Sequence, residues 1–234
     1  MYTYTNFLLF GIYPYIALAV FVFVSIVRFN RDQYNWRSGS SQLLRKRQLF
    51  WGSNLFHFGI LIVFLGHLVG LLTPIEVFDA IGISHSFKQI MAIVVGGVAG
   101  IACFIGLTLL IHRRLFDSRI RATSSFSDIF ILLLLYVQLI LGLLTILVSV
   151  GHLDGEEMVR FMTWAQMIVT FQGGAADLLI DTHPLFKLHL FFGLTVFLVF
   201  PFTRLVHVWS APIWYLGRRG YQVVRTRSDH PAIR

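Results

Sequence analysis

Five long runs of apolar residues constrain this chain more than any other feature of its sequence. They cover residues 7–27, 50–72, 88–111, 126–149 and 185–209. A helix rises about 1.5 Å per residue, so each run can cross a hydrocarbon core about 30 Å thick. Only 13% of the residues are charged, whereas soluble domains contain about 25%. The sequence therefore predicts an all-α integral membrane protein with five transmembrane helices.

The basic residues lie on one side of the predicted membrane domain. All but three of the 19 lysines and arginines fall in segments 28–48 and 112–125 or between Arg204 and the C-terminus. By the positive-inside rule this side faces the cytoplasm, so five spans place the N-terminus outside and the C-terminus inside. We expect residues 1–212 to form the membrane domain and residues 213–234 a basic cytoplasmic tail. The same distribution accounts for the net charge of +8, and we do not expect nucleic-acid binding.

Three further segments carry predictions about partners and local structure. Segment 28–48 and the tail are long enough to bind a partner protein on the cytoplasmic face, with membrane lipid headgroups as the alternative partner. Segment 150–184, on the opposite side, contains Trp164 and is expected to hold a short amphipathic helix. The single cysteine, Cys103, lies in the third span and is expected to be a small buried hydrophobic residue.

Four of the nine histidines lie inside predicted spans, where an imidazole needs a partner. His57 and His67 are in the second span, and His189 and His207 are in the fifth. The two spans run in opposite directions, so His67 pairs in depth with His189, and His57 pairs with His207. Two imidazoles at one depth on facing helices suit the axial ligation of a b-type haem, so the sequence predicts a bundle with two bis-histidine haems. Both are noncovalent, because a chain with one cysteine has no CxxCH motif.

Other uses of these histidines stay open at this point. A zinc site requires its ligands at one place, whereas these histidines fall at two depths. A proton relay in a channel or transporter is one alternative, and a purely structural membrane anchor is another. On a continuous fifth helix the residues between His189 and His207 rise about 27 Å, compared with about 15 Å between His57 and His67.

Residues close to the four histidines are candidates for supporting roles. Gly66 and Gly70 flank His67. Small residues at this spacing favour helix packing, or they leave space for a flat macrocycle or a quinone. Arg204, close to His207, is a candidate contact for haem propionates, with anchoring at the membrane interface as the alternative. The remaining histidines are expected to be solvated, at positions His85, His112, His152, His183 and His230.

Seven stretches spread over almost the whole chain form a recognisable set. They are IYPYIA at 12–17, QYNWRSGSSQ at 33–42, SNLFHFGIL at 53–61, GHLVGLLTP at 66–74, RRLFDSRIRATSS at 113–125, WAQMIVTFQGG at 164–174 and FPFTRLVHVWSAP at 200–212. Through these stretches the chain closely resembles the gamma subunit of membrane-bound respiratory nitrate reductase, a cytochrome b with five spans.

The resemblance implies a path for electrons. His67 and His189 would bind the outer (distal) haem, and His57 and His207 the inner (proximal) haem. Electrons would pass from the distal to the proximal haem and then to a cytoplasmic iron–sulfur subunit. That partner would pass them to a molybdenum subunit, where nitrate is reduced. The resemblance thus implies a location in the bacterial cytoplasmic (inner) membrane.

The resemblance also implies quinol oxidation near the outer face, with protons released outside. Lys88, at the outer start of the third span, would serve the quinol site, and Gly66 and Gly70 would form its neighbouring wall. The alternative for Lys88 is an interfacial anchor, and no role can be transferred to His85. A second possibility for the whole chain is the haem b anchor of a different complex, such as a hydrogenase or a sulfite- or heterodisulfide-type reductase.

Overall fold

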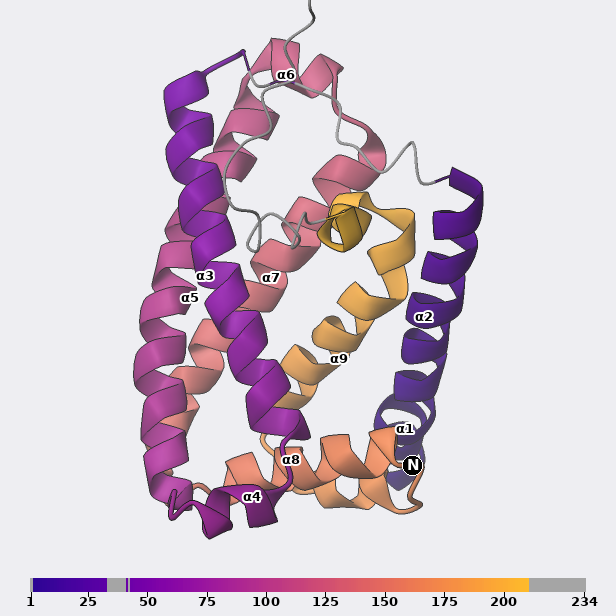
Figure 1. The fold of residues 1–234 in the computed structure, drawn as a ribbon, viewed down its shortest axis with the longest axis vertical. Helices are drawn as coiled ribbons and strands as arrows, with labels where there is room; N and C mark the ends of the chain where they lie inside the picture. Colours follow the sequence, from indigo (N-terminus) through magenta and orange to yellow (C-terminus); the bar gives the residue numbers. More distant parts are fainter. Residues whose placement is uncertain (1, 33–40, 42, 211–234) are drawn as a thin grey trace, which may run out of the picture.

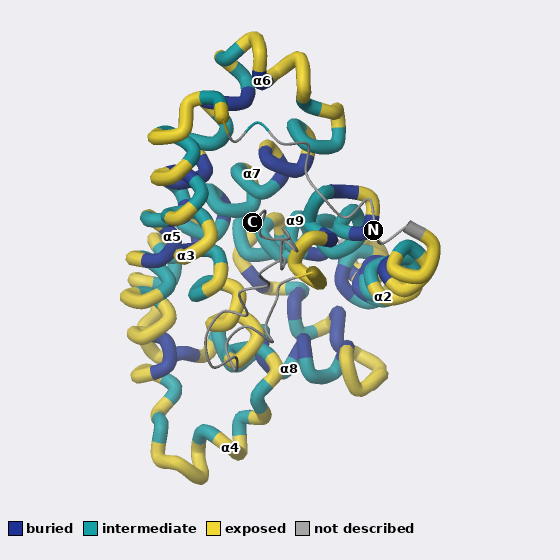
Figure 2. Tube along the Cα trace, turned by 45° about the horizontal axis from the view of Figure 1, so that its top comes forward, coloured by how far each residue is buried: buried dark blue, intermediate teal, exposed yellow. Residues whose placement is uncertain are grey.

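The five predicted spans are all present as long apolar helices. The computed structural model describes residues 2–32, 41 and 43–210, and these residues form helices and turns without a strand. The segments long and apolar enough to cross a membrane are Thr3–Arg31, Lys46–Leu72, His85–Phe116, Phe126–Ser149 and Pro184–Phe202. Most positions on these helices are exposed or only partly buried, which suits a surrounding of lipid (Figure 2). The all-α membrane fold predicted from the sequence is confirmed.

The first span consists of three consecutive helical elements. They are α1 (Tyr2–Phe7), a π-helical turn η1 (Leu8–Ile12) and α2 (Tyr13–Asp32). Pro14 has no backbone N–H, and its ring would clash with the carbonyl one turn earlier in a regular α-helix. The wider π turn directly before Pro14 accommodates this ring without ending the span.

The remaining spanning helices are α3 (Lys46–Leu72), α5 (His85–Phe116), α7 (Phe126–Ser149) and α9 (Pro184–Val199). Short elements connect them: α4 (Ile75–Ala80), α6 (Ser118–Ala122), α8 (Glu156–Val169) and the 3₁₀ helix η3 (Ala175–Leu179). The helices pack in the order α3, α5, α7, α9, α2 (Figure 1). Within the described part of the chain, α3 and α9 are not a closely packed pair.

The fifth helix ends earlier than the sequence predicts. We expected the span to run to residue 209 with a bend at Pro201, but α9 ends at Val199. Two 3₁₀ helices follow, η4 (Phe200–Phe202) and η5 (Arg204–Ser210). Pro201 lies in η4 and cannot donate the hydrogen bond that an α-helix requires at its position. The rise of about 27 Å between His189 and His207, which assumed a regular helix, therefore does not apply.

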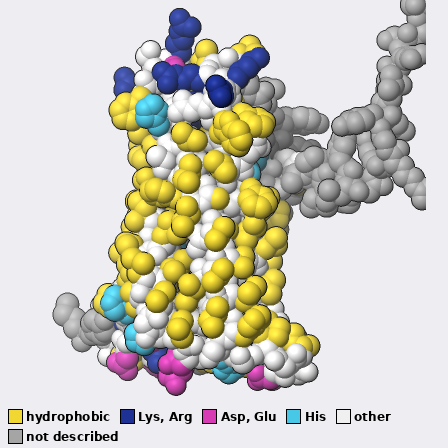
Figure 3. Space-filling view, turned by 90° about the vertical axis from the view of Figure 1, so that its left-hand side faces the viewer, with side chains coloured by type: hydrophobic (Ala, Val, Ile, Leu, Met, Phe, Trp, Pro, Cys, Tyr) yellow, Lys and Arg dark blue, Asp and Glu magenta, His cyan; other side chains and the backbone are white. Residues whose placement is uncertain are grey.

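The charged side chains separate to the two ends of the molecule, with an apolar belt between them (Figure 3). We call the end with α6 the basic end, because it carries Arg113, Arg114, Arg119 and Arg121. We call the opposite end, formed by α4 and α8, the acidic end. Of the predicted docking loop 28–48, residues 33–40 and 42 lie outside the described residues, as does the tail 213–234.

The acidic end is closed by α8, which runs across the other helices (Figure 1). This helix buries Met162, Trp164, Ala165 and Ile168 and leaves a more polar face outward. The Trp164 indole N–H donates a hydrogen bond of 3.0 Å to the Phe10 carbonyl, which ties α8 to the first span. The short amphipathic helix predicted within 150–184 is therefore confirmed.

Helix α3 contacts α5 through a narrow stripe of small residues. A Cβ atom added at Gly59 would lie 2.5 Å from the Ala99 carbonyl oxygen, and one added at Gly106 would collide with the Phe56 backbone nitrogen. Cys103 is fully buried in this contact, as expected for a small hydrophobic residue. The rest of α3 is largely exposed.

The substitution Gly106→Ala should separate α3 from α5. Its added methyl group meets backbone atoms, which cannot rotate away, so we expect destabilisation by roughly 1–3 kcal/mol. Thermal unfolding of the purified protein in detergent measures the change. Gly97→Ala is the matched control on the same helix, because its Cβ would make an ordinary contact of 3.7 Å with Ile146. Equal stability of the two variants would show that the close approach at Gly106 is unimportant.

Candidate functional site

The structure brings the four membrane histidines together in the two predicted pairs. His67 on α3 and His189 on α9 have ring centroids 6.1 Å apart. His57 on α3 and His207 on η5 have ring centroids 6.2 Å apart. The His67–His189 pair lies toward the acidic end and the His57–His207 pair toward the basic end, so the pairing by depth holds.

The spacing within each pair matches that of two imidazoles on one metal. A metal–imidazole bond is about 2 Å long, so two such bonds in line place the ring centres roughly 6 Å apart. Both pairs have this separation. Among the described residues, no group of three or more His, Cys, Asp or Glu residues is placed to hold a metal ion. A metal bound by either pair would therefore need further ligands from outside this set of side chains, and the macrocycle of a haem supplies four of them.

Backbone carbonyls orient three of the four imidazole rings. His57 Nδ1 is 2.7 Å from the Ser53 carbonyl oxygen, and His67 Nδ1 is 2.8 Å from that of Val63. His207 Nδ1 is 2.5 Å from the Arg204 carbonyl oxygen. A carbonyl can only accept, so Nδ1 is the donor in each contact, and in a neutral imidazole this leaves a free lone pair on Nε2. This tautomer is the one that metal-binding histidines adopt when the other ring nitrogen is hydrogen-bonded.

His189 is held by packing against α7. A Cβ atom added at Gly142 would lie 3.0 Å from His189 Cε1, so the absence of a side chain at position 142 makes room for the ring. Gly142 is not among the site residues predicted from the sequence. Its position four residues after Gln138 on an apolar helix carries no signal that distinguishes it from ordinary small residues.

The two glycines beside His67 border open space. A Cβ atom at Gly66 or Gly70 would meet no atom of the described residues within 4 Å. Among the described residues they therefore make no helix–helix packing contact, although such packing was one of the two interpretations of these glycines. The other interpretation, that they leave space for a flat macrocycle or a quinone, is compatible with this open space.

Lys88 lies in the first turn of α5, near the acidic end, and its side chain is buried. Its ammonium nitrogen stacks over the Phe78 ring at 4.5 Å. Among the described residues the nitrogen has no hydrogen-bond partner. A buried ammonium with unused donors is costly without an acceptor, so it is suited to bind an oxygen atom of a ligand. Phe78 lies on α4 outside the spans, and no sequence pattern connects it with Lys88.

His85, one turn before Lys88, is partly exposed and forms a pair at the surface. Its Nε2 atom is 3.4 Å from Asp79 Oδ1. The structure thus gives His85 an acidic neighbour, and the histidine takes no part in either membrane pair.

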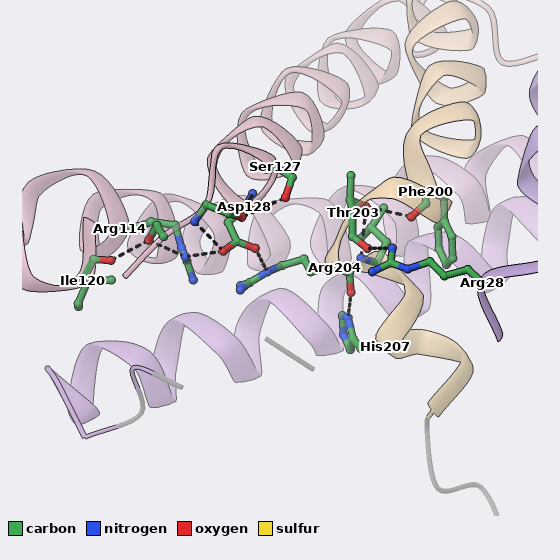
Figure 4. Close-up of polar contacts among 12 residues, drawn as sticks. Arg28, Arg114, Ile120, Ser127, Asp128, Phe200, Thr203, Arg204 and His207 are labelled. Atoms are coloured by element: carbon green, nitrogen blue, oxygen red, sulfur yellow. Dashed lines mark hydrogen bonds and ion pairs between the residues drawn. The ribbon is translucent and has the colours of Figure 1, made fainter. Parts of the chain in front are cut away.

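Arg204 has a partner that the sequence analysis did not name. Its Nε atom is 2.8 Å from Asp128 Oδ1, on α7 (Figure 4). Its Nη2 atom is buried and has no partner among the described residues. One donor of Arg204 is therefore committed to Asp128, and a second is available to a ligand such as a haem propionate. Asp128 is the only acidic residue in the first turn of its predicted span, where the sequence indicates a helix cap. The sequence alone therefore did not connect Asp128 with Arg204.

Comparison with known proteins gives a consistent result. Residues 6–227 match the family model described as nitrate reductase gamma subunit. The chain is 50% identical to the respiratory nitrate reductase 1 gamma chain of Escherichia coli (strain K12) over 222 residues, which are 95% of this chain and 98% of that protein. It is 44% identical to the nitrate reductase gamma chain of Bacillus subtilis (strain 168) over 94% of this chain and 98% of that one.

A more distant relative comes from an archaeon. The Hdr-like menaquinol oxidoreductase cytochrome b-like subunit of Archaeoglobus profundus (strain DSM 5631 / JCM 9629 / NBRC 100127 / Av18) is 26% identical over 92% of this chain and 61% of that protein.

Proposed function

Because the chain belongs to the nitrate reductase gamma subunit family, we propose that it oxidises quinol and delivers the electrons across the membrane. Family membership makes it a multi-pass membrane cytochrome b subunit of a respiratory nitrate reductase, an oxidoreductase complex with catalytic and electron-transfer partners. What remains to be assigned is the role of each residue.

The two histidine pairs are the axial ligands of two noncovalent b-type haems. His67 and His189 hold the distal haem, and His57 and His207 hold the proximal one. The observation that supports this proposal is the ring separation of 6.1 and 6.2 Å in the two pairs. When bound, the haems supply a one-electron path from the quinol end to the partner subunit, distal before proximal. The carbonyl contacts of His57, His67 and His207 keep each Nε2 atom free for this ligation.

Quinol binds near the acidic end, beside the His67–His189 pair. Lys88 donates a hydrogen bond to a quinol oxygen, and Gly66 and Gly70 leave space for the ring. The unpartnered Nζ atom of Lys88 supports this role. Each quinol releases its two protons on this side of the membrane.

The basic end faces the cytoplasm, as the positive-inside rule requires. An iron–sulfur subunit docks there and passes electrons to a molybdenum subunit, in which nitrate is reduced. The chain lies in the bacterial cytoplasmic membrane, and its acidic end faces outward. Each electron moved inward across 100 mV stores about 2.3 kcal/mol, so quinol oxidation contributes to the membrane potential.

The purified complex should contain two b-type haems for each copy of this chain. A dithionite-reduced minus oxidised spectrum together with a pyridine haemochrome assay measures the type and number of haems. A single haem would mean that one histidine pair does not ligate. A colourless, correctly assembled complex would overturn the redox proposal and favour proton transfer through the histidines. The identity of the subunits that copurify with the chain distinguishes a nitrate reductase from another complex with a haem b anchor.

A further inference from the structure

His207 lies on a segment outside the regular α-helices, so helical hydrogen bonds alone do not fix its position. It belongs to η5, after the break that ends α9. Thr203, between η4 and η5, is in an extended conformation with ψ at 178°. His57, which faces His207, lies instead in the regular helix α3. The position of His207 therefore depends on contacts between this segment and neighbouring helices.

Two side chains from other helices hold the segment. Arg28 of α2 donates hydrogen bonds to the carbonyl oxygens of Pro201 and Thr203. Asp128 of α7 accepts a hydrogen bond of 2.8 Å from Arg204 Nε. Figure 4 shows both contacts beside the His207 ring. The Arg204 carbonyl in turn accepts from His207 Nδ1 at 2.5 Å, so one residue connects the Asp128 carboxylate with the imidazole.

The Asp128 carboxylate is itself held rigidly at the start of α7. Its Oδ2 atom accepts from the Ser125 backbone N–H at 3.2 Å, and the Ser125 hydroxyl accepts from the Asp128 N–H, which forms a capping box. Arg114 of α5 lies 3.5 Å from the same Oδ2 atom. The side chains of Asp128, Arg114 and Arg204 are 15%, 10% and 20% exposed, so this small ionic cluster is poorly screened by solvent.

We propose that Asp128 is the positioning residue for His207 and that the Asp128–Arg204 ion pair sets the reduction potential of the haem that His207 binds. This inference rests on the proposed function, because it assumes that His207 is a haem ligand. The carboxylate fixes Arg204, and Arg204 presents its carbonyl to His207 Nδ1. Hydrogen bonds and charges next to a ligand tune the potential of the metal that it binds.

The two charges of the pair should act on the potential in opposite directions. A negative charge near a haem stabilises the oxidised state, which carries one more positive charge than the reduced state. Asp128→Asn should therefore raise the potential of the His207-linked haem, and Arg204→Gln should lower it. Asp128→Glu, which keeps the charge, should restore a potential close to that of the unchanged protein. A purely structural role would instead disturb the site in the same direction in both single variants.

The experiment is an optical redox titration of the complete purified complex, with haem content measured on each sample. The second haem, bound by His67 and His189, serves as an internal reference that should not shift. Asp117→Asn is the matched control, because Asp117 also caps a helix at the basic end and pairs with an arginine, Arg45, at 2.8 Å. No contact among the described residues links that pair to His207, so both potentials should stay unchanged.

Opposite shifts of one haem in Asp128→Asn and Arg204→Gln, with Asp117→Asn unchanged, would support the proposal. Unchanged potentials, or shifts of both variants in the same direction, would overturn it. If Asp128→Asn does not assemble, the Arg204→Gln variant is the test. A lower potential of the His207-linked haem in that variant supports the proposal, and an unchanged potential overturns it. If the proposed function itself fails, the result is different, because the unmodified complex would then contain fewer than two haems for each copy of this chain.

Discussion

Replacement of His67 by alanine should reduce the haem content from two to one per chain. The remaining haem should be the one bound by His57 and His207, whose rings and carbonyl contacts lie on other turns of α3 and on η5. His189 alone cannot provide both axial ligands, and the alanine methyl group offers no lone pair. Quinol-dependent nitrate reduction should fall to background, because the site beside His67 loses its electron acceptor. Haemochrome assays and quinol oxidation rates measure the two effects.

The matched control for His67→Ala is His152→Ala. His152 Nδ1 also lies near the carbonyl oxygen four residues earlier, that of Val148, at 3.3 Å. Within the described residues no second histidine ring faces it, so its removal should leave both haems in place. Two haems in the His67→Ala complex would contradict the assignment of the His67–His189 pair.

Replacement of Lys88 by methionine should abolish most quinol oxidation while both haems stay bound. Methionine has a similar length and remains compatible with the buried position over Phe78, but it cannot donate a hydrogen bond. A hydrogen bond to a charged group contributes about 1.5–3 kcal/mol, so quinol turnover should decrease roughly tenfold to hundredfold. Steady-state oxidation of a soluble quinol analogue, together with a reduced-minus-oxidised spectrum, measures both properties on one sample.

Arg160→Gln provides the control for Lys88→Met. Arg160 is a cation at the same end of the molecule, but its Nη1 atom is paired with Glu157 Oε1 at 3.2 Å on α8. Its loss should leave quinol turnover close to that of the unmodified complex. If Lys88→Met retains full turnover, Lys88 is an interfacial anchor and the quinol must bind through other residues. Equal losses in both variants would indicate a general effect of positive charge at this end.

Much of this architecture follows from residue patterns that act locally or through the membrane. A run of apolar residues must form a helix in lipid, since every backbone N–H and C=O group needs a partner inside the segment. Five such runs therefore predicted five spanning helices. The antiparallel course of the second and fifth spans also placed His57 beside His207 and His67 beside His189, because depth in a bilayer depends mainly on distance along the helix.

Contacts between distant parts of the chain account for what the sequence analysis missed. After the local break at Pro201, the position of His207 depends on side chains that lie more than seventy residues away in sequence, namely Arg28 and Asp128. Such pairings leave no periodic signal, because they depend on how helices cross and not on the spacing within one helix. The same reason applies to the room that Gly142 leaves for His189 and to the Phe78 ring under Lys88. Hydropathy and helix direction thus predicted which histidines meet, whereas helix packing sets how each side chain is held.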